Sequence, residues 1–314
     1  MPGPEEYSSD MNTIPVSLRR LAIVAALTSG LTAAAQSIQF FTLQKVQNFT
    51  QTVAGSAAPD SVSPSTFSAT IQGTALDSTH PSSLPAVTTP ATSGVSAFNL
   101  TYFSVYGWEH MVDFGSQGAM DLSFKNGTYV SQMGFGVTSP FSLSLTGDYY
   151  PNNPLAGLTG GNWMGGVYQL DPANAWTLNS GSFTFNAPGG AANSRIEIAI
   201  SGTGVNFNQA AGFGTTNTFS GSTGSMSLSS GDVGAPTFLA GNNYNVEIRF
   251  ISGTDYQDIG LAVGQTAGSA FGVALYDSHL SFTIQAVPEP STYAALAGAA
   301  ALGLAFWRRR FRTN

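Results

Sequence analysis

Short alternating segments recur along most of this chain, and they restrict its fold more than any other feature of the sequence. From Val95 onward they begin about every 8 to 15 residues and are separated by Gly, Pro, Asn and Asp. Ile196, Ile198 and Ile200 alternate with polar or small residues, which is the pattern of a strand with one buried face. Such strands bury one side each when two sheets pack face to face. The sequence therefore predicts an all-β fold, an antiparallel β-sandwich or jelly roll.

Three local patterns add detail to this fold. Residues 37–71 are rich in Thr, Val and Phe but alternate imperfectly, so we predict edge strands there. The apolar segment 118–124 predicts a further strand, and the Asn126-Gly127 pair after it predicts a two-residue hairpin. The spacing from Leu239 to Tyr244 is similar to the strand entry of fibronectin-type sandwiches, in which a tyrosine hydroxyl ties a corner.

Residues 74–94 are rich in Ser, Thr, Pro and Ala. Such a segment is either a linker between two β-subdomains or a long loop that crosses between two sheets, and the sequence favours neither. Without the two ends described below, residues 36–286 are left, which suffice for one large β-domain or two small ones. We predict that they form the ectodomain of an exported protein.

Charged residues are scarce, at 9% of the chain against about 25% in an average soluble protein. Residues 36–286 contain 13 acidic and four basic residues, a net charge of −9. This balance does not suit nucleic acid, whose binding depends on Lys and Arg that neutralise phosphates. The chain has no cysteine, which excludes disulfides, zinc–thiolate sites and cysteine nucleophiles. Its stability must come from the β-core, with bound cations as a further source.

The N-terminus has the pattern of a secretory signal peptide over residues 1–35. A pair of arginines is followed by the apolar residues 21–35, which we expect to form a signal helix. Ala33 and Ala35 are small residues at the −3 and −1 positions, which predicts cleavage after Ala35. Acidic residues near the beginning of the chain do not suit such a signal, so we predict that translation starts at Met11.

The C-terminal segment, residues 287–314, falls into three parts. Pro288-Glu289-Pro290 is stiff and extended, since each proline fixes its own φ and keeps the preceding residue out of the helical region. Residues 293–307 carry no charge and suit a lipid environment. A basic tail of the kind that stays on the cytoplasmic side of a bilayer follows. It contains Arg308, Arg309, Arg310 and Arg312.

This order of features resembles the PEP-CTERM protein-sorting signal. The residues that carry the resemblance are Val287, Pro288, Glu289, Pro290 and Ser291, followed by the apolar run and the arginines. In that family a membrane-embedded exosortase recognises the signal, so the resemblance implies a bacterial precursor anchored by a transmembrane helix over residues 292–307. It also implies that Arg308 to Arg310 form the cytoplasmic stop, and that cleavage near the tripeptide releases the protein. This helix is shorter than the about 20 residues that span a bilayer comfortably.

Two sets of acidic residues are candidates for chemistry. Glu109, His110 and Asp113 are close in sequence, but on a strand His110 points away from both carboxylates, so we predict neither metal binding nor catalysis there. Asp255 and Asp258 could ligate calcium, which takes about six to eight oxygen ligands. Turn aspartates that bond their own backbone are the simpler interpretation. We therefore predict no cofactor, with calcium as the candidate exception.

Aromatic residues crowd the middle of the chain, and Trp108, Trp163 and Trp176 are the candidates for contact with a glycan. Their rings could stack on sugars of an extracellular polysaccharide. The interpretation that we favour is that these rings fill a core that is short of Leu and Ile. No G-x-S-x-G elbow or paired-carboxylate motif gathers the groups needed for hydrolysis.

Together these features predict a protein exported through the secretory pathway as a membrane-anchored precursor. We expect its mature form at the cell surface or in the extracellular matrix, with a non-enzymatic structural or adhesive role linked to exopolysaccharide or biofilm. The alternative is a secreted carbohydrate-binding module or glycan-active enzyme. Two carboxylates within about 10 Å in a groove lined by Trp163 and Trp176 would favour hydrolysis, whereas tryptophans inside the core would favour a structural role.

Overall fold

The computed structural model describes one of the two units into which the chain divides, Met1–Ala35 and Gln36–Asn314. All described residues belong to the second unit. The predicted cleavage residues Ala33 and Ala35 therefore lie outside them, as do Pro288 to Ser291, Arg309, Arg310 and the side chain of Asp258. The described residues are 37–74, 86–104, 107–132, 141–152, 154–181, 183–184, 190–212, 219, 223–258, 271–287, 297–304 and 307–308.

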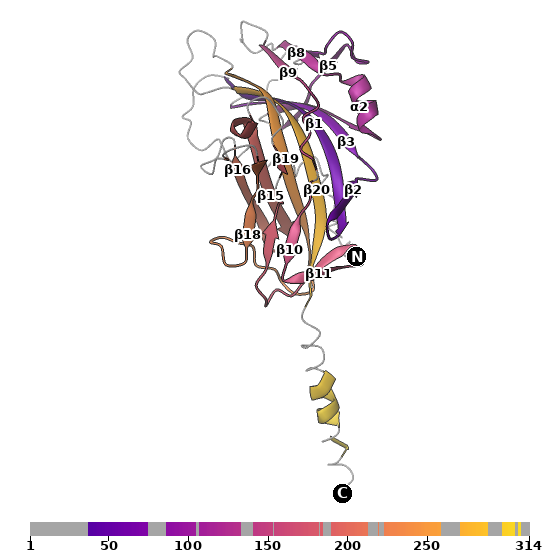
Figure 1. The fold of residues 1–314 in the computed structure, drawn as a ribbon, viewed down its shortest axis with the longest axis vertical. Helices are drawn as coiled ribbons and strands as arrows, with labels where there is room; N and C mark the ends of the chain where they lie inside the picture. The colour runs from indigo at the N-terminus through magenta and orange to yellow at the C-terminus, as the bar shows by residue number, and fades with distance from the viewer. Residues whose placement is uncertain are drawn as a thin grey trace, which may run out of the picture. The chain divides into compact units, whose positions relative to one another are not determined.

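One large sheet of 11 strands contains the longest strands of the protein (Figure 1). Its main path runs β16 (Val205–Gly212), β15 (Ser194–Gly202), β19 (Asn243–Asp258), β20 (Phe271–Ala286), β1 (Ser37–Val53), β3 (Ser65–Thr74), β7 (Gly107–Phe114) and β6 (Thr101–Ser104). Beside this path, β2 (Ser56–Pro59) pairs with β1, β12 (Val167–Leu170) pairs with β20, and β11 (Gly161–Met164) pairs with β12. The predicted all-β class is confirmed.

Strands β1 and β20 lie at the centre of this sheet and run parallel to each other. Their pairing extends from Phe40 opposite Phe271 to Thr50 opposite Ser281. Parallel neighbours need a long connection, and here it is the whole domain between the two strands. The sheet is therefore mixed rather than purely antiparallel. The prediction of edge strands over residues 37–71 was wrong, because β1 has β20 on one side and β3 on the other.

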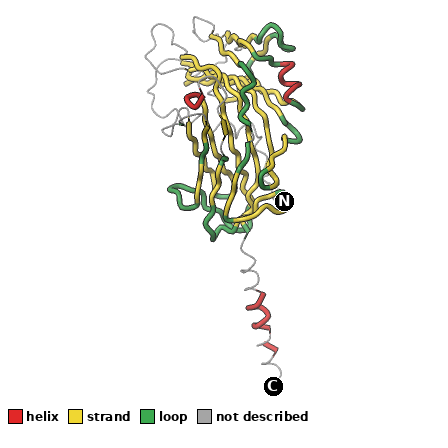
Figure 2. Tube along the Cα trace, in the orientation of Figure 1, coloured by secondary structure: helices red, strands yellow, loops and turns green. Residues whose placement is uncertain are grey.

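Shorter strands form a second layer, and strands outnumber helices throughout the described residues (Figure 2). This layer includes a four-stranded and a three-stranded sheet. The first has the order β5 (Ala97–Asn99), β4 (Ala86–Thr88), β8 (Gly127–Gln132), β9 (Phe141–Leu145), and the second the order β10 (Gly157–Thr159), β13 (Thr177–Asn179), β18 (Ser227–Ser229). A small pair joins β14 (Phe183–Thr184) to β17 (Thr223–Gly224).

Two hydrophobic cores lie between the large sheet and these smaller sheets. One face of β20 contributes to both cores. Tyr276 belongs to the first core, and Leu280 and Phe282, further along the strand, belong to the other. The core beneath the four-stranded sheet joins Phe41 of β1 to Leu143 of β9. The other core gathers the predicted inward residues of β15 with residues of β13, β18 and β19. Sheet-on-sheet packing of this kind is the sandwich arrangement expected from the alternation.

A short helix replaces a predicted strand between β7 and β8. The helix is α2 (Gln117–Ser123), and the hydroxyl of Ser116 caps it by accepting from the Ala119 backbone N–H at 3.2 Å. The predicted hairpin at Asn126-Gly127 was also wrong, since β8 pairs with β4 and β9. A single apolar side chain, Met120, is buried on this helix, so the segment carries almost no helical periodicity. One more helical turn, the 3-10 helix η2 (Gly190–Asn193), precedes β15.

The tyrosine corner predicted from the sequence is confirmed. The backbone N–H of Leu239 donates to the hydroxyl of Tyr244 at 2.7 Å, and the Tyr244 ring is fully buried at the beginning of β19. This bond fixes the direction in which the chain enters the long strand.

The Ser/Thr/Pro-rich segment 74–94 contains β4 of the four-stranded sheet, and its residues 75–85 lie outside the described ones. Strands on both sides of the segment, β3 and β7, pair with each other.

Beyond the β-domain, residues 297–304 and 307–308 are helical. Within the described part of the chain, no helix has the length and apolar character required to cross a membrane.

Candidate functional site

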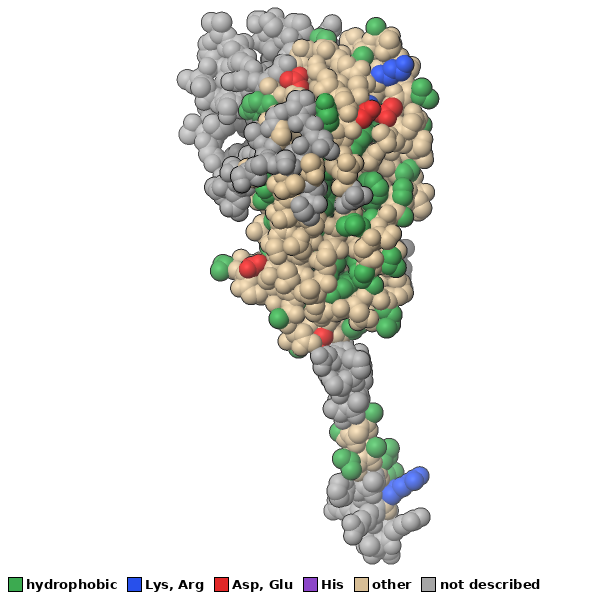
Figure 3. Space-filling view, viewed as in Figure 1, with side chains coloured by type: hydrophobic (Ala, Val, Ile, Leu, Met, Phe, Trp, Pro, Cys, Tyr) green, Lys and Arg blue, Asp and Glu red, His purple; other side chains and the backbone are tan. Residues whose placement is uncertain are grey.

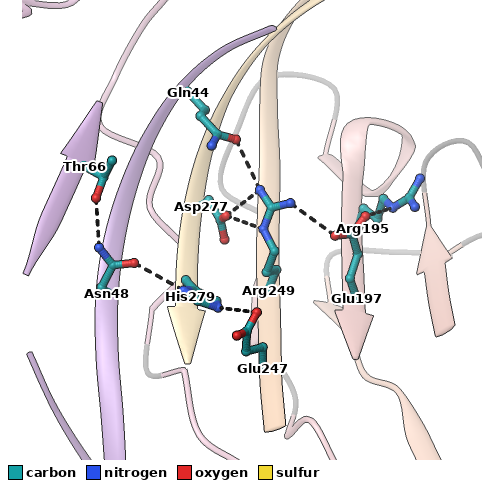
Figure 4. Close-up of polar contacts among 9 residues, drawn as sticks. All are labelled: Gln44, Asn48, Thr66, Arg195, Glu197, Glu247, Arg249, Asp277 and His279. Atoms are coloured by element: carbon teal, nitrogen blue, oxygen red, sulfur yellow. Dashed lines mark hydrogen bonds and ion pairs between the residues drawn. The ribbon is translucent and has the colours of Figure 1, made fainter. Parts of the chain in front are cut away.

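A row of polar and charged side chains crosses the face of the large sheet that points away from the two cores (Figure 4). Alternation places it there, because Ile196, Ile198 and Ile200 enter a core and their neighbours point to the opposite face. We call this set the polar face. Its residues are Gln44, Asn48, Thr66, Arg195, Glu197, Glu247, Arg249, Asp277 and His279.

Arg249 of β19 is the centre of the polar face. Its guanidinium contacts Asp277 Oδ2 through Nε at 2.7 Å and Nη2 at 2.6 Å, and it contacts Glu197 Oε2 through Nη1 at 3.3 Å. A further bond joins Nη2 to Gln44 Oε1 at 3.2 Å, so one side chain links β15, β20 and β1 (Figure 4). Burial lowers the pKa of Arg249, but Asp277 and Glu197 outweigh this effect and hold that pKa above its usual value. The two carboxylates therefore favour the charged form of this arginine.

Glu197 lies between two arginines. Its Oε1 is 2.6 Å from Arg195 Nε, and its Oε2 faces Arg249. The side chains of Glu197 and Asp277 are only 3% and 1% exposed, so both carboxylates depend on these cations for the charge balance that burial requires. Two arginines and two carboxylates make this cluster electrically neutral.

A second chain of contacts begins at His279 of β20. Its Nδ1 lies 3.2 Å from Asn48 Oδ1, and its Nε2 lies 3.6 Å from Glu247 Oε2. Asn48 Nδ2 donates to Thr66 Oγ1 at 3.1 Å, and the Thr66 hydroxyl donates to Asp113 Oδ1 at 2.6 Å. These contacts follow the strand order from β19 to β7, so they brace neighbouring strands against one another.

The chemistry of the polar face is that of mutual pairing. Arg195 and Glu197 pair within β15, and the other ion pairs of the polar face join neighbouring strands (Figure 4). Among the residues that the structure describes, no group of three or more His, Asp or Glu side chains could hold a metal ion. The arrangement provides lateral stiffness across β15, β19, β20 and β1.

The acidic cluster singled out on β7 is divided between two faces, as alternation predicts. His110 stacks on Phe98 with ring centroids 4.3 Å apart on the core side. Burial lowers the pKa of His110 below its usual value, so its neutral form is favoured there. Asp113 bonds to Thr66 on the opposite side of the sheet.

Asp255, one of the two calcium candidates, fastens the four-stranded sheet to β19. Its Oδ2 accepts from the backbone N–H of Ser144 at 2.8 Å, and the neighbouring Thr254 hydroxyl donates to Ser144 O at 3.1 Å. A bulge in the β19–β20 ladder between Gly253 and Asp255 places the two side chains for this task.

Two of the three candidate tryptophans lie inside the cores. Trp108 is 1% exposed and Trp176 is 6% exposed, so a sugar could reach neither ring unless the core opened, and the proposed glycan contact fails for both. Trp163 on the β11–β12 hairpin is half-buried and packs edge-on against Tyr168 and Phe282. Trp176 therefore does not line a groove that a glycan could enter. On the face shown in Figure 3, charged side chains are few and uncharged polar and backbone atoms predominate.

The roles of Arg249 and Lys45 were not predicted from the sequence. The scarcity of basic residues was a signal for both roles. Residues 36–286 contain only four basic residues, and three of them lie in strands. Lys45 stands at an apolar-facing position of β1, between Leu43 and Phe49 on the same face, and is completely buried. A cation at such a position implies a dedicated partner.

The C-terminal end of β20 is held by backbone contacts until the last residue before the tripeptide. Ala286 N donates to Asn242 O at 2.9 Å, and Val287 N donates to Leu170 O at 2.8 Å. The chain is thus a mixed β-sandwich whose central strand leads directly into the proline-flanked C-terminal segment. Such an arrangement defines a folded domain followed by a C-terminal targeting segment.

Comparison with known families identifies this targeting segment. Residues 286–310 match the family model of the PEP-CTERM protein-sorting motif, which confirms the resemblance of the C-terminal segment. The motif implies an exported protein, made as a membrane-anchored precursor and processed by an exosortase, a membrane enzyme. The match concerns the C-terminal segment and not the β-domain. A search among curated proteins found no match.

Proposed function

We propose that the mature chain is a structural or adhesive protein of the cell surface or extracellular matrix, acting without a catalytic centre or a cofactor. The sorting signal delivers it there, and the β-domain is the part that remains. Exopolysaccharide is the partner that this location offers.

The proposal rests on the position of the sorting motif, which follows the central strand β20 directly. The sheet holds the chain through Val287, and the tripeptide begins at the next residue. Cleavage beside Glu289 would remove no residue of either core. A protein built in this way can lose its anchor and keep its fold.

The use of the acidic residues supports a structural role. Asp277 and Glu197 neutralise Arg249, and Asp255 fastens Ser144. Asp60 accepts from the backbone N–H groups of Val62 and Ser63 at 2.9 and 2.8 Å, which stabilises the turn between β2 and β3. These carboxylates stabilise the fold. In a glycosidase, by contrast, two carboxylates would face each other in a groove.

The test separates location from binding. Cells that make the full chain are fractionated, and protease treatment of intact cells reveals whether the β-domain is outside. The released protein is then sedimented with exopolysaccharide purified from the same culture and, as a control, with dextran. We expect surface or matrix location and selective sedimentation. Hydrolysis of the polysaccharide would instead support the glycan-active alternative, and retention inside the cell would contradict the proposal.

A further inference from the structure

The geometry points to a self-formed amide cross-link between the Lys45 amine and the Asn126 side chain. It would join β1 to the turn before β8, with Asp121 of helix α2 as the proton carrier. The inference concerns a modification site in the core and is independent of the proposed function.

Lys45 occupies the centre of an aromatic core. Its cross-strand neighbours are Tyr276 on β20 and Phe67 on β3. Phe67 stacks on Phe124 with ring centroids 3.8 Å apart, and the Lys45 side chain is 1% exposed. Burying a charged ammonium in such surroundings costs free energy, whereas burying a neutral amide costs much less.

The groups required for amide formation surround the amine. Lys45 Nζ lies 2.6 Å from Asp121 Oδ1 and 2.9 Å from Asn126 Oδ1. The Tyr276 hydroxyl donates to the same Asn126 Oδ1 at 2.7 Å, so two donors polarise the carboxamide carbonyl. The amide nitrogen of Asn126 donates to Asp148 Oδ1 at 2.8 Å, which orients the leaving group away from the amine.

The reaction needs no oxidant or cofactor. The Lys45 ammonium gives a proton to the Asp121 carboxylate, and the neutral Nζ attacks Asn126 Cγ while Tyr276 stabilises the oxyanion. The new Nζ–Cγ bond forms, and the Cγ–Nδ2 bond breaks. The two protons lost from Nζ leave with Nδ2 as ammonium, so Asp121 ends as a carboxylate. Asp121 is 30% exposed, which gives the ammonium a route to water.

The cross-link would supply what this exported chain lacks. It has no cysteine, and the bond would join residues 81 positions apart. Like a disulfide, it would restrict the unfolded chain. It would also fix central strand β1 to the four-stranded sheet through β8.

Chymotryptic mapping of the full chain tests the bond directly. Cleavage after aromatic residues separates residues 42–49, which contain Lys45, from residues 125–129, which contain Asn126. We expect the two peptides as one species whose mass is their sum less one ammonia, about 17 Da. Separate peptides from folded wild-type protein, whether or not Asn126 is deamidated, would overturn the proposal.

Two variants and a control identify the residues responsible. Asp121→Asn keeps an acceptor for Lys45 but removes the proton carrier, and we expect a folded chain with separate peptides. Asn126→Ala removes the carbonyl, and we expect the same result. Lys125→Met removes the neighbouring amine within the same chymotryptic peptide and should leave the link intact. A link that persists in Asn126→Ala, or is lost in Lys125→Met, would refute the assignment.

Discussion

Replacing Arg249 with Met should destabilise the β-domain far more than any other loss of a single positive charge on the polar face. Met retains the length of the stem but removes the guanidinium that contacts Asp277 and Glu197. Asp277 is 1% exposed, and its Oδ1 has no hydrogen-bond partner among the described residues, so its carboxylate depends on Arg249. Removing one partner of a buried ion pair typically costs about 3–5 kcal/mol.

The size of the loss can be measured by thermal unfolding, followed by circular dichroism at pH 7. For a domain of this size, each kcal/mol lowers Tm by about 2–4 °C, so the expected decrease is about 6–20 °C. Arg195→Met is the matched comparison, because Glu197 keeps Arg249 as a partner when Arg195 is lost, whereas Asp277 loses its guanidinium partner in Arg249→Met. We expect a smaller decrease in Tm for Arg195→Met than for Arg249→Met.

The double variant Arg249→Met/Asp277→Leu sharpens the test. It removes the buried carboxylate together with its partner, so its Tm should recover above that of Arg249→Met. If Arg249→Met were as mild as Arg195→Met, the polar face would not be the buried electrostatic brace described above.

Three further predictions concern other parts of the fold. Tyr244→Phe removes the hydroxyl that accepts from the backbone N–H of Leu239 and should cost about 0.5–1.5 kcal/mol in urea unfolding, because a part-buried hydrogen bond is lost. Asp255→Ala removes the carboxylate that accepts from the backbone N–H of Ser144 and should cost about 1–3 kcal/mol, seen as a lower urea midpoint. Burial lowers the pKa of His110, so the unfolded chain binds its proton more readily. Stability should therefore be constant above about pH 6.5 and fall as the pH decreases below it, and His110→Gln should reduce this fall in urea midpoints.

A different result would contradict each of these three predictions. An unchanged urea midpoint in Tyr244→Phe would mean that the corner bond contributes nothing to stability. Added calcium that raises the midpoint of the wild type but not of Asp255→Ala would restore Asp255 as a metal ligand. A pH profile that His110→Gln leaves unaltered would assign the acid sensitivity to other groups.

Some local patterns predicted local structure correctly, although the strand over 118–124 and the Asn126-Gly127 hairpin were wrong. The alternation of Ile196, Ile198 and Ile200 placed β15 and its buried face, and the spacing before Tyr244 predicted a corner that the Tyr244 hydroxyl closes. The order of proline, apolar run and arginines identified the sorting motif, because that signal is read as a linear segment. Each of these features depends on residues that are close in sequence.

Features that depend on distant residues could not be predicted in this way. The parallel pairing of β1 with β20 joins the two ends of the domain, and no pattern within β1 indicates its partner. Helix α2 was missed because its single buried residue, Met120, sets no period. The ion pairs of Arg249 combine three strands, so its partners became visible only once the strand order was known.

Replacement of Pro288-Glu289-Pro290 by three alanines tests the central claim most directly. The full chain and the variant are produced in a bacterium that contains an exosortase, and each is followed by molecular mass and by fractionation into membrane and culture medium. The wild type should lose its C-terminal segment and leave the membrane fraction, whereas the variant should remain as the uncleaved, membrane-anchored precursor. Processing and release of the variant at the rate of the wild type would contradict the account.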